Sequence, residues 1–174
     1  VKLENEVERL VNKQTHQAMQ AIVYNLNTMH SRAGSQVPFS SINIGIPLSK
    51  DAANVCQAFL EEYAKGLGGG EQPIFPNIIF RVKKGVNRDP QDPYFYLFEL
   101  ACKVTGERMN PTFMNIDADF NKEYYDKGIL PATMGCRTYI MSNCNGEPGV
   151  EGRGNNAPTT INLPRIAIQA TGNI

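Results

Sequence analysis

The sequence predicts an α/β fold with a parallel sheet, because strand-like runs alternate with helical runs along most of the chain. The helical runs place apolar residues at steps of three and four, and the strand-like runs are rich in β-branched and aromatic residues. In chain order we expect a helix over 3–30, a strand over 37–45, a helix over 50–65, a strand over 74–82, a helix over 92–105, a strand over 111–116, a helix over 119–126, a strand-like run over 138–141 and a closing strand over 159–170.

The first helix is the strongest of these predictions, because residues 3–30 contain neither Gly nor Pro and carry a broad apolar stripe. A continuous helix of that length would extend roughly 40 Å, which is more than a lone domain usually needs. It could pack in a core or at a subunit interface. We therefore divide the chain into residues 1–32, a long helix expected at a bundle or dimer interface, and residues 33–174, which carry the sheet.

Capping residues and apolar stripes locate the next two helices. Either Ser49 or Asp51 is available as the N-cap of the second helix, and Pro93 suits the first turn of the third. Cys56 and Cys102 fall among the apolar residues of these helices, so we expect both thiols to lie in the core.

A glycine-rich stretch over 66–71 separates the second helix from the second strand. Phosphate-binding glycine loops follow a strand and open a helix, which is the reverse of this order. The stretch also lacks the Gly-Lys-Ser/Thr ending of a P-loop. We interpret it as a flexible connection.

Charge and composition exclude several functions. The 17 Lys and Arg residues balance the 17 Asp and Glu residues, so no net field favours nucleic acid or an anionic membrane. No apolar run approaches the roughly 20 residues that cross a bilayer. The first residues do not resemble a secretory signal, and we expect a cytoplasmic piece of a longer chain. His16 and His30 are on the order of 21 Å apart along one helix, so we predict no metal site in this segment.

A cysteine in a tight loop is the main candidate for chemistry. Cys136 follows Gly135 and precedes a strand-like run, which places one sulfur at the tip of a turn between structured segments. An ordinary nucleophilic thiolate needs a cation or a paired histidine. Arg137 would point to the opposite side of an extended segment, and neither histidine is near in sequence. A Cys–His hydrolase is therefore disfavoured.

Several motifs extend beyond this loop. They are Ser-Arg-Ala-Gly-Ser-Gln-Val-Pro-Phe-Ser-Ser-Ile-Asn at 31–43, Glu-Gln-Pro-Ile-Phe-Pro-Asn at 71–77, Met-Gly-Cys-Arg-Thr at 134–138, Gly-Arg-Gly-Asn at 152–155 and Asn-Leu-Pro-Arg-Ile-Ala at 162–167. Together and in this order they resemble the anaerobic, glycyl-radical ribonucleoside-triphosphate reductases. The resemblance implies a ten-stranded α/β barrel, of which residues 33–174 would form a part around a central cysteine loop.

The resemblance also implies roles for single residues. Cys136 would act as a thiyl radical that removes hydrogen from C3′ of the ribose, and Asn155 would bind the 3′-hydroxyl. Gly135 would let the loop turn, and Met134 would pack beside the sugar. We add Ser41 and Asn43 as candidate substrate contacts, because they share one face of a strand that should face the barrel interior.

Further parts of such an enzyme are expected outside this segment. The resemblance implies a glycyl-radical loop and a four-cysteine zinc site C-terminal to it, and a second active-site cysteine N-terminal to it. It also implies a homodimer, ATP and deoxynucleotide effectors, and an activating enzyme that uses S-adenosylmethionine and an iron–sulfur cluster. We therefore expect these 174 residues to be inactive alone.

Two alternatives remain at this point. One is another glycyl-radical enzyme, of the pyruvate formate-lyase or diol dehydratase type, which would share a barrel and a cysteine loop. The other is a non-catalytic nucleotide-binding regulatory module, in which the long first helix carries the function.

Overall fold

A computed structural model describes residues 2–135, 138–140, 143, 145–147, 149, 152 and 160–170. Helices and strands alternate through its first two thirds, as the sequence predicts. The elements are α1 (Lys2–Thr28), β1 (Ser41–Ile44), α2 (Lys50–Lys65), β2 (Asn77–Val82), α3 (Phe95–Arg108), β3 (Thr112–Asn115), α4 (Asp119–Asp126), β4 (Ala132–Met134), β5 (Thr138–Ile140) and α5 (Leu163–Gln169).

The first three strands form one parallel sheet in the order β1-β2-β3, with helices α2 and α3 as the connections. Ser41 pairs with Asn77, and Ile79 pairs with Thr112. This arrangement confirms the predicted parallel α/β architecture. β4 and β5 form a separate antiparallel pair, with Met134 opposite Thr138. The alternation of helices and strands did not reveal this pair, because each strand is only three residues long.

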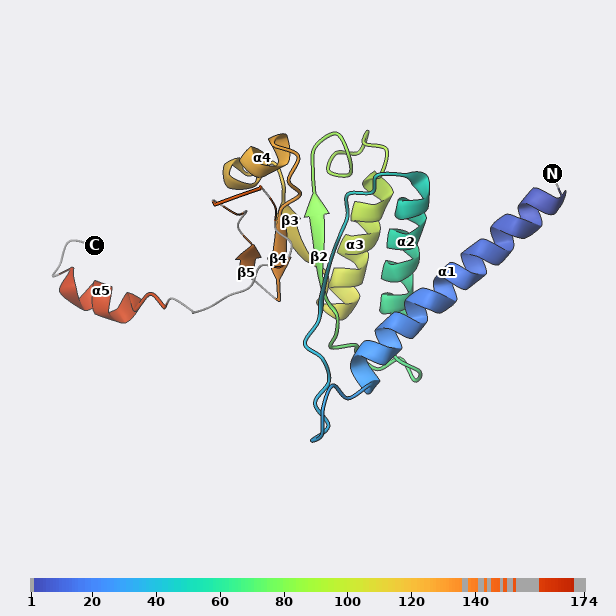
Figure 1. The fold of residues 1–174 in the computed structure, drawn as a ribbon, viewed down its shortest axis with the longest axis horizontal. Helices are drawn as coiled ribbons and strands as arrows, with labels where there is room; N and C mark the ends of the chain where they lie inside the picture. Colours follow the sequence, from blue (N-terminus) through green and yellow to red (C-terminus); the bar gives the residue numbers. More distant parts are fainter. Residues whose placement is uncertain are drawn as a thin grey trace.

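Helices α1, α2 and α3 cover one face of the parallel sheet; α2 and α3 lie side by side there, with α1 beside α2 (Figure 1). Alternate residues of the strands point into this layer, as the strand period of two requires. The core between the sheet and the helices is apolar; its buried members include Val23, Phe59, Leu60, Tyr63, Ile78, Phe80, Leu97, Ala101 and Val104.

A smaller apolar cluster lies on the opposite face of the sheet. Ile79, Met114 and Ile116 are buried there, and Tyr125 and Tyr139 pack against them. Tyr139 belongs to β5, so the antiparallel pair covers the sheet face that points away from the main helical layer. The two faces of β2 are therefore both buried, which explains its nearly continuous apolar sequence.

Helix α1 packs through its C-terminal half. Val23 is 2% exposed and belongs to the main core, and Asn27 binds the chain segment that leads into β2. The N-terminal half has a different environment, since Leu3, Leu10 and Val11 are 44% exposed or more. The helix ends at Thr28, two residues before the predicted end.

The predicted features of α2 are confirmed. Ser49 is its N-cap, and the Ser49 hydroxyl accepts a hydrogen bond of 3.1 Å from the backbone N–H of Ala52. Cys56 is 6% exposed and belongs to the main core. The glycine-rich stretch after this helix contains no helix or strand, as expected for a connection.

The third helix begins later than predicted. It starts at Phe95, and Pro93 lies in the loop before it. The cause is Asp92, whose carboxylate oxygen Oδ2 accepts hydrogen bonds from the backbone N–H groups of Gly85, Arg88 and Asp89. These bonds hold the loop closed and keep Asp92 out of the helix.

The expectation that Cys102 is a core residue is wrong. Its side chain is exposed on α3, while Ala101 and Val104 supply the buried face of that helix. The helix is apolar on more than one side, so sequence periodicity did not identify the buried face.

The predicted closing strand over 159–170 is also wrong, because residues Leu163–Gln169 form helix α5. Asn162 is its N-cap, and its side-chain oxygen accepts a hydrogen bond of 2.9 Å from the backbone N–H of Arg165. Pro164 lies in the first turn, where proline needs no N–H donor. The local capping signal outweighs the strand preference of the isoleucines.

Among the helices that the structure describes, none is both long enough and apolar enough to span a membrane.

Candidate functional site

The candidate site is the turn between β4 and β5. Met134 ends β4 and pairs with Thr138 at the start of β5, so residues 135–137 connect the two strands. This hairpin agrees with the prediction of structured segments on both sides of the turn. The two predicted catalytic residues, Cys136 and Asn155, lie outside the described residues, and their roles stay predictions.

Gly135 has a backbone conformation that favours glycine. Its φ is +63°, in the left-handed region where a Cβ atom is strained. A Cβ atom there would also lie 3.2 Å from Cε1 of Phe39. Both facts agree with the expectation that Gly135 allows the chain to turn.

Two side chains of the parallel sheet hold the backbone of Gly135. The N–H of Gly135 donates a hydrogen bond of 3.2 Å to Oγ of Ser41, and its carbonyl oxygen accepts one of 2.7 Å from Nδ2 of Asn77. Ser41 and Asn77 are paired residues of β1 and β2, so their side chains project from the same face of the sheet. The turn is therefore fixed on both sides of one residue.

A third side chain holds the strand that leads into the turn. Nδ2 of Asn43 donates to the carbonyl oxygen of Thr133 at 2.9 Å, and the N–H of Thr133 donates to Oδ1 of Asn43 at 3.2 Å. The Asn43 side-chain amide thus makes the same two hydrogen bonds to Thr133 that a paired residue of an antiparallel strand would make. We call Ser41, Asn43 and Asn77 the backbone clamp.

The structure thus brings together four of the residues that the sequence singled out. Ser41 and Asn43 bind the backbone beside Gly135, while Met134 is 38% exposed. The predicted contact of Ser41 and Asn43 with substrate stays a prediction. Both polar atoms of the Asn43 amide already bind Thr133, which leaves one N–H and one lone pair for any further partner.

Sequence reasoning missed Asn77 as a site residue. It lies in the motif at 71–77 that carries part of the resemblance, but the sequence assigns no role to it. Its role depends on the parallel register, which places it beside Ser41 although 36 positions separate them in the sequence. Strand pairing between distant segments is not visible in the sequence alone.

A cation lies further along the same strand face. Arg81 alternates with Ile78 and Phe80 on β2, so it points away from the helical layer, as Asn77 does. Burial lowers the pKa of the Arg81 guanidinium to about 10, and its Nε has no hydrogen-bond partner. The group stays protonated at neutral pH and gives this face a positive charge that suits an anionic group.

The two described cysteines are poor candidates for chemistry. Burial raises the pKa of the Cys56 thiol to about 11, although a backbone contact with Gly45 opposes the shift. Burial and the charge of Glu99 also raise the pKa of Cys102. Within the described ranges, no three His, Cys, Asp or Glu side chains group together as a metal site would require.

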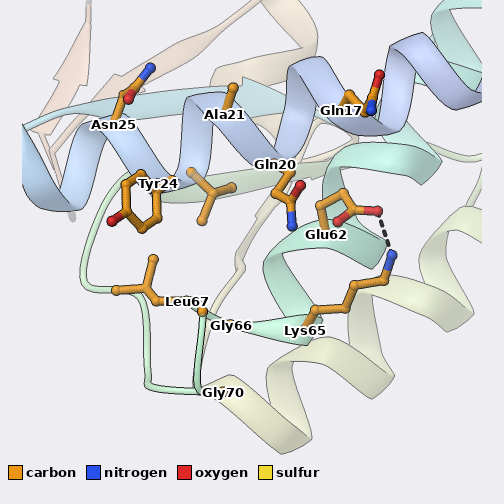
Figure 2. A pocket seen from close by; sticks show the side chains of 12 residues that line it. Gln17, Gln20, Ala21, Tyr24, Asn25, Glu62, Lys65, Gly66, Leu67 and Gly70 are labelled. Carbon is orange, nitrogen blue, oxygen red and sulfur yellow. Dashed lines mark hydrogen bonds and ion pairs between the residues drawn. The ribbon is translucent and has the colours of Figure 1, made fainter.

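A cavity of about 500 Å³ lies between α1 and the glycine-rich connection. Figure 2 shows Gln20 and Tyr24 of α1 pointing toward the turn that contains Leu67. The cation among its lining residues is Lys65, whose Nζ lies 2.5 Å from the buried carboxylate of Glu62. The cation that lines this cavity is therefore already paired with a carboxylate.

The fold and the turn together define an α/β segment in which side chains of a parallel sheet hold the backbone of Gly135. The family model for anaerobic ribonucleoside-triphosphate reductase matches residues 3–174. The chain therefore belongs to this family.

Individual relatives agree with this assignment. The chain is 32% identical over 170 residues to the anaerobic ribonucleoside-triphosphate reductase of Haemophilus influenzae, which covers 97% of the chain and 23% of that protein. It is 31% identical over 163 residues to the anaerobic ribonucleoside-triphosphate reductase of Escherichia coli, a match that covers 92% of the chain and 22% of that protein. It is 33% identical over 169 residues to the anaerobic ribonucleoside-triphosphate reductase of Enterobacteria phage T4, a match that covers 95% of the chain and 27% of that protein. The chain spans about a quarter of the length of these relatives.

Proposed function

We propose that this chain is the segment of an anaerobic ribonucleotide reductase that carries the radical cysteine, Cys136. The complete protein would convert ribonucleoside triphosphates to 2′-deoxyribonucleoside triphosphates. The observation that carries the proposal is the clamped turn at Gly135 in a chain of this family. A reactive sulfur that must meet one carbon atom of a sugar needs such a fixed backbone.

The proposed chemistry assigns one task to each residue near the turn. The Cys136 thiyl takes the hydrogen atom from C3′ of the ribose and forms an S–H bond. The 2′-hydroxyl takes up a proton and leaves as water, and an external reductant, formate or a thiol protein, supplies two electrons that form the new C2′–H bond with a second proton. Cys136 then returns its hydrogen to C3′ and is a thiyl radical again. Asn155 would bind the 3′-hydroxyl through its amide, which can donate and accept. Met134 would pack beside the sugar.

The architecture of the complete protein is part of the proposal. The parallel β1-β2-β3 sheet with its helices on one face would be an arc of a ten-stranded α/β barrel. Within the described residues, β1 and β3 are the edges of this sheet, and each could accept a neighbouring strand from the remainder of the protein. The clamp and Arg81 would then face the barrel interior.

The remaining parts would come from outside this segment. A glycyl radical supplies the oxidising equivalent when an activating enzyme with S-adenosylmethionine and an iron–sulfur cluster has formed it. A zinc site, ATP or deoxynucleotide effectors and a cytoplasmic homodimer complete the proposal, with no nucleic-acid or membrane partner. The exposed apolar residues in the first half of α1, Leu3, Val7, Leu10 and Val11, support a helix that meets another subunit.

The experiment replaces Cys136 with Ala in the full-length, activated protein and measures deoxynucleotide formation. We expect the activity to disappear, because the proposed hydrogen abstraction needs the sulfur of Cys136. Cys102→Ala is the matched control, since Cys102 is an exposed thiol on α3. Undiminished activity of Cys136→Ala would refute the proposed role of Cys136.

A further inference from the structure

We propose that Asn77 is a positioning residue for the radical cysteine, and that it acts with Ser41 and Asn43 by holding the peptide group that precedes Cys136. This inference rests on the proposed function, because it assigns the backbone clamp to the same cysteine. Asn77 itself touches neither the substrate nor the sulfur in the proposed chemistry.

The position of the Asn77 bond is the first argument. The carbonyl group of Gly135 belongs to the peptide bond that joins Gly135 to Cys136, and it accepts the 2.7 Å hydrogen bond from Nδ2 of Asn77. A peptide group is planar, so fixing its oxygen also fixes the direction in which the next Cα atom lies. Asn77 therefore acts on the cysteine through a single rigid unit.

The absence of a side chain at Gly135 is the second argument. A glycine has no side chain of its own to pack, and it has more backbone freedom than any other residue. The left-handed conformation at φ +63° is thus maintained by hydrogen bonds at both ends of the residue, to Ser41 and to Asn77. Without them the turn would sample other conformations.

The rigidity of the support is the third argument. Ser41 and Asn77 are partners in the parallel register of β1 and β2. Directly after them, Ile42 packs against the main core and Ile78 is 0% exposed within it. Asn43 adds two bonds to Thr133, two residues before Gly135. The clamp is thus mounted on strands, which hold a site more accurately than loops do.

The test uses the full-length, activated protein with Asn77→Leu and Ser41→Ala. Asn115→Leu is the matched control, because Asn115 is an exposed asparagine of the neighbouring strand β3 whose side chain binds Asp117 and not the 133–135 segment. Amide hydrogen exchange of the peptide covering 132–140 reports the order of the turn. Steady-state kinetics report kcat and KM, and the unfolding midpoint reports stability.

We expect Asn77→Leu and Ser41→Ala to speed amide exchange at 132–140 by about tenfold or more, since local opening controls exchange. We expect kcat to fall by roughly 10- to 100-fold while KM changes by less than about threefold, because misplacement of a reacting group affects the transition state. Asn115→Leu should change neither quantity. Ser41→Thr, which keeps the hydroxyl, should recover the protection that Ser41→Ala loses.

Two outcomes would overturn the inference. One is unchanged exchange at 132–140 in Asn77→Leu, and the other is an equal loss of kcat in Asn115→Leu. If Cys136→Ala stays active, the proposed function fails, but the exchange experiment still decides whether the clamp orders the turn. The two failures are therefore distinguishable.

Discussion

Asn27 and Phe75 are joined by two hydrogen bonds that connect the last turn of α1 to the chain entering β2. Oδ1 of Asn27 accepts from the N–H of Phe75 at 3.0 Å, and Nδ2 donates to the carbonyl oxygen of Phe75 at 2.5 Å. Oδ1 of Asn27 also accepts a hydrogen bond of 2.8 Å from the N–H of Ile74. One side chain thus fixes the segment immediately before Asn77, and so links the long helix to the strand that holds the cysteine turn.

Asn27→Ala should lower the free energy of unfolding by about 1–2 kcal/mol, because the N–H and carbonyl groups of Phe75 lose their partners. Asn25→Ala is the control: it lies on the same helix and gives the same gain in helix propensity. The difference between the two variants in chemical denaturation isolates the hydrogen bonds. Equal midpoints for the two variants would show that the connection adds no stability.

Gly45→Ala should be much more destabilising than Gly85→Ala. Both glycines have positive φ, +109° and +81°, so both substitutions strain the backbone by about 1–2 kcal/mol. At Gly45 a Cβ atom would also lie 2.5 Å from the backbone oxygen of Arg81, whereas at Gly85 the space is open. Thermal unfolding of the two variants measures the difference. A similar loss in both would mean that β1 can shift away from β2.

Glu62 should stabilise the fold in a pH-dependent manner. Burial raises its pKa, but the hydrogen bonds from Lys65 and His16 outweigh this and leave the pKa below its ordinary value of 4.5. The stabilisation is therefore present above pH 4.5 and is lost as the pH falls through the lowered pKa. We expect Glu62→Gln to cost about 1–2 kcal/mol at pH 7 and little in strong acid. Glu8→Gln is the control, since Glu8 is an exposed carboxylate on α1. A stability difference that does not change with pH would contradict the assignment.

Cys102 should react with iodoacetamide at pH 8 at least about tenfold faster than Cys56. Cys102 is exposed, whereas burial raises the pKa of Cys56 to about 11, so little thiolate forms there. Mass spectrometry of the two peptides measures the rates. In concentrated urea the rates should become similar, because the difference arises from the fold. A fast reaction of Cys56 in the folded protein would show that the core around α2 opens readily.

Local sequence patterns were sufficient for most of the secondary structure. Apolar spacing gave helices close to α1, α2 and α4, and the Ser49 cap is where α2 begins. Two of the errors occurred where a side chain bound a backbone group locally. Asp92 delays the start of α3, and Asn162 starts a helix where isoleucines suggested a strand.

The motifs of the chain determined its family, and composition with periodicity determined its parallel α/β architecture, because both are properties of neighbouring residues. Only the tertiary structure placed Asn77 next to Ser41 and set both against Gly135, more than 50 positions further along the chain. Such contacts depend on the register between separate strands and on how β4 lies across the sheet. These are decided by the packing of the whole domain, which no local pattern encodes.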